Sequence, residues 1–121
     1  MNKVTPESLL YMGRYTYDNL VSIREAVDSE DDAQALFDAG YLAGLIVQKA
    51  DDLEPEDMEG TGVSLKELYE IAMQISLYIS SVRDMIIGGE ITEAIQILKN
   101  TQEYVREKMR VYEMRQKEVS E

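Results

Sequence analysis

The stretch Thr5-Pro6-Glu7-Ser8-Leu9-Leu10 has the composition of a helix start. The threonine hydroxyl can accept hydrogen bonds from the free amides of the first turn, and the proline suits the first helical position because its missing N–H would have no partner there. Glu7 places a negative charge at the positive end of the helix dipole. Apolar residues then recur at helical spacing to about Asp28. The sequence therefore predicts an amphipathic helix over residues 6–28.

A second helix is predicted from the polar segment 29–32 to about Leu53. This segment interrupts the apolar pattern and offers an N-cap, with Asp32 in the position of the return acid of a capping box. Inside the helix, Gly40 and Gly44 lie one turn apart, and each glycine costs about 1 kcal/mol relative to alanine. We expect another helix to pack closely against these glycines; the alternative is a tolerated loss of helix propensity.

Two more helices are predicted after a polar loop at about residues 54–63. Ser64, with Glu67 three residues later, has the spacing of a capping box and predicts the start of the third helix. Gly88-Gly89 ends it, because glycine accepts the left-handed geometry beyond a helix end. The fourth helix is expected from near Ile91 to about Lys117.

These parts predict one all-α domain over residues 1–121, an antiparallel four-helix bundle built from two helical hairpins. A flexible loop joins the hairpins, and the last turns, at about 113–121, are expected to fray. A pair of tetratricopeptide-like repeats is the rival arrangement. The predicted helices are about twice as long as the helices of such repeats, and no period near 34 residues is present.

The composition argues against catalysis. The chain has no histidine, cysteine or tryptophan, so the usual zinc ligands and a cysteine nucleophile are absent, and it has no phosphate-binding loop motif. We expect a protein that is not an enzyme, with no metal and no cofactor. The longest apolar run, residues 41–47, is far shorter than the roughly 20 residues that span a bilayer. Because the N-terminus also has no apolar signal core, we expect a soluble cytoplasmic protein without membrane insertion.

The net charge of −12 is unevenly distributed. Residues 28–59 contain eleven acidic side chains and one basic side chain, Lys49. Such a surface repels phosphate backbones, so nucleic acid is not an expected partner. Three interpretations remain for the acidic segment: a solvated face, a contact for a partner with a basic surface, or an acidic inhibitor that mimics DNA on a DNA-binding protein.

The order of motifs resembles the family of flagellin export chaperones (FliS). The sequence Thr-Pro-Glu-Ser-Leu-Leu-Tyr-Met at residues 5–12 is similar to the family's Ser-Pro-Glu-x-Leu-Leu-x-Met. Residues 65–69, Leu-Lys-Glu-Leu-Tyr, resemble the Leu-x-x-Leu-Tyr of its third helix. The resemblance spans about Val4 to Met109. Members usually carry a longer tyrosine-bearing segment before Ser-Pro, whereas residues 1–4 precede the matching motif here, so we expect a divergent member.

This resemblance implies a cytoplasmic chaperone. Such a protein would hold the amphipathic helices of flagellin, or of a flagellin-like client, in an apolar groove and prevent premature polymerisation until export. A component of the export apparatus is a second partner that the resemblance implies.

The candidate groove comes from apolar stripes that are wider than a single core face. The predicted first and third helices are apolar around more than one side, and tyrosine and methionine suit recognition of varied helices. The candidate partner-binding residues are Tyr11, Tyr15, Tyr17, Tyr41, Leu45, Tyr69, Met73 and Leu77. The alternatives are that these side chains belong to the core, or that they form the seam of a homodimer in a self-associating structural bundle.

Overall fold

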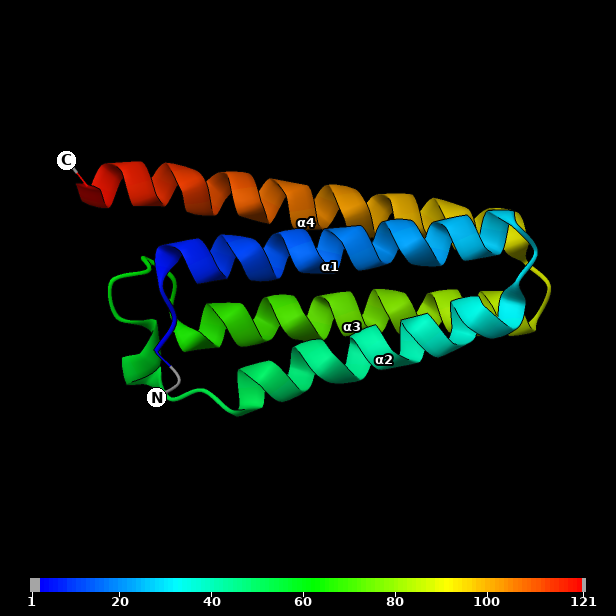
Figure 1. The fold of residues 1–121 in the computed structure, drawn as a ribbon, viewed down its shortest axis with the longest axis horizontal. Helices are drawn as coiled ribbons and strands as arrows, with labels where there is room; N and C mark the ends of the chain where they lie inside the picture. The colour runs from blue at the N-terminus through cyan, green and yellow to red at the C-terminus, as the bar shows by residue number, and fades with distance from the viewer. Residues whose placement is uncertain (1–2, 121) are drawn as a thin grey trace.

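The computed structural model describes residues 3–120, with side chains to residue 118, and contains four long helices (Figure 1). The helices are α1 (Pro6–Asp28), α2 (Asp32–Asp51), α3 (Leu65–Ile87) and α4 (Ile91–Ser120). Each helix runs antiparallel to the next, and α1 and α3 each pack against both α2 and α4. The predicted all-α four-helix bundle is confirmed.

The start of α1 is capped as its sequence predicts. The Thr5 hydroxyl accepts a hydrogen bond from the Ser8 amide at 3.0 Å, and the Ser8 hydroxyl accepts one from the Thr5 amide at 2.9 Å. Pro6 occupies the first turn. The two side chains therefore satisfy two backbone donors at a helix end that would otherwise lack partners.

The turn between α1 and α2 differs from the prediction. Ser29 is the C-cap of α1, and Asp31 caps α2 by accepting from the amide three residues later at 3.2 Å. Asp32 is thus the first helical residue, and the expected capping box is wrong. Glu30 adopts a left-handed backbone (φ 61°) and reverses the chain within three residues. At its other end, α2 stops at Asp51, two residues before the predicted end.

The expected close packing at the α2 glycines is also wrong. Apart from its chain neighbours and the nearby backbone of α2, a Cβ atom built on Gly40 or Gly44 would meet no atom within 4 Å. The tight contact lies instead at Gly13 in α1, where a Cβ atom would lie 2.6 Å from Cγ of Met109 in α4. The glycines of α2 lower helix propensity without allowing a close contact, whereas Gly13 allows Met109 of α4 to pack closely against α1.

The buried side chains form two separate clusters. The larger cluster draws on all four helices and includes the fully buried Leu20, Leu42, Ile79 and Leu98. The smaller cluster lies at the end of the bundle that contains the start of α1 and the loop between α2 and α3. At this end α1 and α2 separate (Figure 1). Its buried members are Val4, Leu9, Met58, Val63, Leu68 and Tyr112. The partly buried Ile71 packs against both clusters.

The loop between α2 and α3 contains a short 3-10 helix, η1 (Pro55–Met58). Met58, Thr61 and Val63 are buried, so the loop contributes to the core. The Thr61 hydroxyl donates to the Met58 carbonyl at 2.7 Å and accepts from the Val63 amide at 3.1 Å. The buried hydroxyl thereby holds the loop in a compact form.

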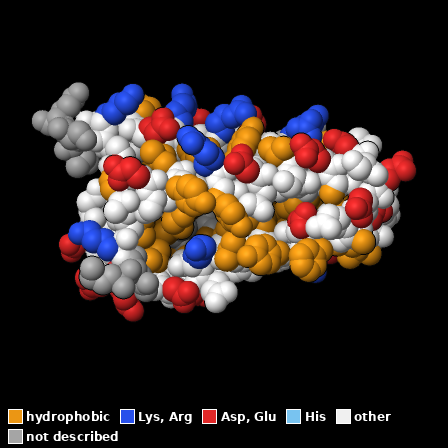
Figure 2. Space-filling view, in the orientation of Figure 1, with side chains coloured by type: hydrophobic (Ala, Val, Ile, Leu, Met, Phe, Trp, Pro, Cys, Tyr) orange, Lys and Arg blue, Asp and Glu red, His pale blue; other side chains and the backbone are white. Residues whose placement is uncertain are grey.

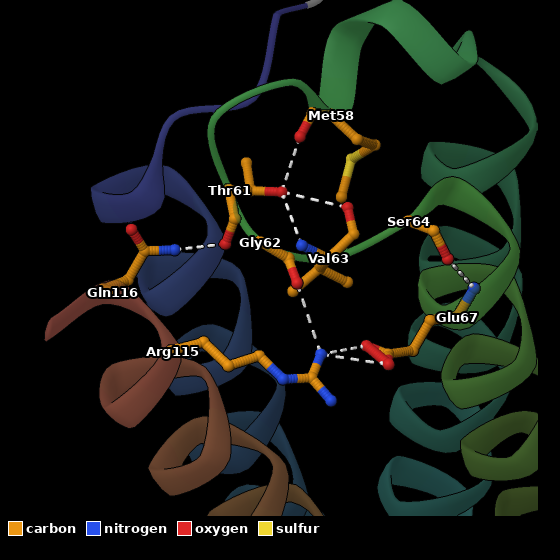
Figure 3. A network of polar contacts seen from close by, with 8 residues as sticks. All are labelled: Met58, Thr61, Gly62, Val63, Ser64, Glu67, Arg115 and Gln116. Carbon is orange, nitrogen blue, oxygen red and sulfur yellow. Dashed lines mark hydrogen bonds and ion pairs between the residues drawn. The ribbon is translucent and has the colours of Figure 1, made fainter. Parts of the chain in front are cut away.

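The end of α4 holds this loop and the start of α3 (Figure 3). Arg115 donates to the Glu67 carboxylate at 3.0 Å, and Gln116 donates to the Thr61 carbonyl. The Ser64 hydroxyl accepts from the Glu67 amide at 3.1 Å, which confirms the predicted cap of α3. The reciprocal half of the predicted capping box does not form, because the Glu67 carboxylate turns to Arg115 instead.

Candidate partner-binding groove

A hollow of about 720 Å³ opens where α1 and α2 separate. We call it the α1–α2 groove. Its rim comes mainly from the first half of α1 and the second half of α2, and buried or partly buried side chains of α3 and α4 form most of its floor. Residues that line the rim include Tyr11, Met12, Tyr15, Tyr41, Leu45 and Lys49. Residues that line the floor include Leu68, Ile71, Ala72, Ile75, Val105, Met109 and Tyr112.

Helical spacing places aromatic rings on both sides of the groove. Tyr11 and Tyr15 lie one turn apart on α1, with ring centroids 6.5 Å apart in a stacked arrangement. Phe37, Tyr41 and Leu45 follow one another at four-residue intervals on α2. Tyr11 is 68% exposed, Phe37 69% and Tyr41 56%. Large apolar side chains that remain exposed on both sides of a hollow are typical of an interaction surface.

Figure 2 shows an extended hydrophobic surface on this face of the molecule. Hydrophobic side chains gather around a hollow in the half of the molecule where α1 and α2 separate, and the band continues along the molecule beyond the hollow. Acidic side chains lie mainly around this apolar surface rather than within it. Although the chain as a whole is acidic, the groove itself is largely apolar.

The structure brings four of the eight candidate residues together. Tyr11, Tyr15, Tyr41 and Leu45 all line the α1–α2 groove. Tyr17 lies apart from them, beside α4. Its hydroxyl accepts a hydrogen bond from Arg106 at 2.6 Å, and the same guanidinium lies over its ring, 5.4 Å from the centroid.

The three candidates on α3 form a second apolar stripe outside the groove. Tyr69, Met73 and Leu77 recur at four-residue intervals and are 37%, 41% and 60% exposed. None of them lines the groove. A hydrogen bond between the Tyr69 hydroxyl and Asp51 at the end of α2 raises the pKa of that tyrosine. This stripe is a separate surface on the outer side of α3.

Sequence reasoning did not assign several groove residues to the site. Phe37 does not line the hollow, but it lies one turn before Tyr41 on α2 and continues the exposed row of that helix. Met12, Met109 and Tyr112 also line the groove, and each recurs at the helical spacing that is typical of a core stripe. Periodicity identifies the inward face of a helix, but it does not show where two inward faces fail to meet.

Tyr112 is the one floor residue with a buried polar atom that lacks a partner within residues 3–118. The residue is 6% exposed, and no hydrogen bond reaches its hydroxyl. Burial and the nearby Glu67 carboxylate raise the pKa of Tyr112, so the phenol stays neutral at ordinary pH. Tyr112 therefore places one unpaired polar atom beneath the floor, whereas the hydroxyl of Thr16, the other buried polar residue that lines the groove, donates to the Met12 carbonyl.

The charged residues that line the groove are mostly basic. They are Lys3, Lys49 and Lys108, with Asp52 as the acidic member. Lys108 has its ammonium 5.5 Å from the centroid of the Tyr104 ring, a cation–π contact. Within the described chain, no three potential metal-ligating side chains cluster. The groove is thus an apolar surface with basic groups at its edge.

No protein-family model matches this chain, and no curated protein or solved structure is significantly similar to it. Among residues 3–120, no helix combines the length and the apolar character needed to cross a membrane. The properties of the groove are therefore the main basis for a functional proposal.

Proposed function

We propose that this protein is a cytoplasmic chaperone that resembles the flagellar export chaperones. Its client is an amphipathic helix of flagellin or of a flagellin-like protein, held in the α1–α2 groove so that the client does not polymerise prematurely. The observation that carries the proposal is the hollow of about 720 Å³ with exposed aromatic side chains on both sides. The ordered motifs at residues 5–12 and 65–69 supply the link to flagellin, and an export-apparatus component is the second proposed partner.

The physical basis is helix-in-groove recognition. An amphipathic client helix would bury its apolar stripe between Tyr11 and Tyr15 on one side and Tyr41 and Leu45 on the other. Tyrosine supplies a rigid apolar area at low entropic cost. Met12 and Met109, which also line the groove, can adapt their shape to different client side chains.

Calorimetry with the C-terminal segment of a flagellin tests this proposal. We expect measurable heat at protein concentrations up to about 0.1 mM, a working range that detects weak as well as strong sites. A control segment in which serine replaces the apolar stripe should give no heat. Absence of binding by the native segment would contradict the proposal.

The exposed stripe on α3 favours a second candidate, a self-associating structural bundle. Tyr69, Met73 and Leu77 would then form the seam of a homodimer. Analytical ultracentrifugation separates the two candidates. A monomer at about 0.1 mM that binds the flagellin segment supports the chaperone, whereas a closed dimer that does not bind it supports the structural bundle.

A further inference from the structure

The charge at the groove has the opposite sign to the charge of the chain. The chain carries 24 acidic and 12 basic side chains, yet three lysines and one aspartate line the groove. The salt bridges within residues 3–118 join Arg106, Arg110 and Arg115 to glutamates, and none uses a groove lysine. Lys3 and Lys49 are exposed at the rim. These two ammonium groups thus remain available to a partner.

The interior of the groove requires an apolar occupant. Leu9, Ile75 and Val105 line it and are 3%, 5% and 4% exposed, so the hollow reaches the level of the core. Side chains that project from a docked helix reach this depth, whereas the helix backbone stays at the rim. The hydroxyl of Tyr112, buried and without a partner, lies on the same floor. The occupant must therefore combine a large apolar side chain at depth with charged groups at the rim.

We propose that the partner of the groove is an acidic amphipathic helix. Its apolar stripe fills the hollow, and Asp or Glu side chains beside that stripe pair with Lys49 and Lys3. This inference rests on the proposed function and specifies the chemistry of the client helix. The net charge of −12 attracts basic helices at a distance. Once a helix is in contact with the groove, the nearby lysines determine which charge is preferred, because dissolved ions screen charges that lie beyond about 8 Å at physiological salt.

Three designed peptides test the charge preference directly. Each has about 18 residues, enough for five helical turns, and the same leucine stripe. The positions beside the stripe carry Glu, Gln or Lys. In calorimetry with the full chain, we expect the Glu peptide to bind about fivefold more tightly than the Gln peptide, as two partly exposed ion pairs would give. The Lys peptide should bind more weakly than both.

Two variants of the chain locate the preference. Lys49→Gln should remove about half of the preference for the Glu peptide. Lys99→Gln is the matched control, because Lys99 is exposed on α4, does not line the groove, and changes the net charge equally. It should leave the preference unchanged. Both substitutions replace exposed side chains, so circular dichroism should show an intact helical fold for each.

The outcomes separate this inference from the proposed function. Equal binding of the Glu and Gln peptides, or equal effects of the two variants, would overturn the inference. If the flagellin segment still binds in that case, the proposed function stands. If neither the flagellin segment nor any designed helix binds, the inference and the proposed function are both overturned.

Discussion

At the scale of single residues, Tyr112 has unfavourable surroundings because its hydroxyl is buried without a hydrogen-bond partner. A buried hydroxyl without a hydrogen-bond partner loses its contact with water and gains nothing in return, at a cost of about 1–3 kcal/mol. The aromatic ring itself packs well, with the Arg115 guanidinium 5.8 Å from its centroid. The unfavourable contribution is therefore confined to one oxygen atom.

Replacing this oxygen tests the assignment. Tyr112→Phe should raise the free energy of unfolding by about 1 kcal/mol, because the variant keeps the ring and removes the unpaired group. Urea denaturation measures the change. Tyr41→Phe, in a residue that is 56% exposed, is the control and should leave stability unchanged. A loss of stability in Tyr112→Phe would mean that the hydroxyl has a partner.

The raised pKa of Tyr112 predicts a dependence of stability on alkaline pH. In the unfolded chain this phenol ionises near its usual pKa of about 10, whereas burial keeps it protonated in the folded chain at that pH. Above about pH 10 the folded state binds more protons than the unfolded state, so stability falls as the pH rises. Tyr112→Phe should lose less stability than the wild type between about pH 9 and pH 11. Identical pH profiles of the two proteins would contradict the prediction.

At the scale of helices, the glycines of α1 and α2 have opposite roles. Gly40 and Gly44 have space for a Cβ atom, so Gly40→Ala and Gly44→Ala should each stabilise the protein by up to about 1 kcal/mol. Gly13→Ala should gain less or lose stability, because its Cβ atom would require Met109 to move. Thermal denaturation of the three variants checks this order. A destabilising effect of both α2 substitutions would show that another helix does approach there.

Local signals predicted most of the helix boundaries. The hydroxyl caps at Thr5 and Ser64 depend on residues within the same turn, so the sequence alone was sufficient to place them. The turn at residues 29–31 was misplaced because several polar residues there can cap a helix, and the left-handed Glu30 decides among them. The return acid Glu67 was misassigned for another reason. Its ion pair with Arg115 joins residues that are 48 positions apart.

The site could be predicted only in part. Spacing identified Tyr11, Tyr15, Tyr41 and Leu45 as apolar side chains beyond the core stripe, and these four line the groove. Spacing did not distinguish these groove residues from the α3 stripe of Tyr69, Met73 and Leu77. The distinction depends on which neighbouring helix covers each helix face. The groove exists where α1 and α2 separate, and this separation is a property of packing between helices rather than of either helix sequence.

At the scale of the whole molecule, two apolar surfaces have different predicted roles. Tyr41→Asp adds a charge to the groove rim and should weaken binding of the flagellin segment at least about tenfold. Leu77→Asp adds the same charge to the outer stripe of α3, at a residue that is similarly exposed (60% against 56%), and should leave binding unchanged. Calorimetry compares the two variants. Equal loss of binding in both would contradict the assignment of the client to the groove.

The division of the interior into two clusters has a consequence for cooperativity. Within the described residues, Ile71 is the hydrophobic residue that packs against both clusters, so we expect the end of the bundle near Val4 and Met58 to open without disrupting the interior around Leu20 and Leu98. Amide deuterium exchange in the free protein should be faster at that end. A ligand seated between the clusters would make the two ends exchange as one unit, so the chain would gain rigidity at a distance from the contact.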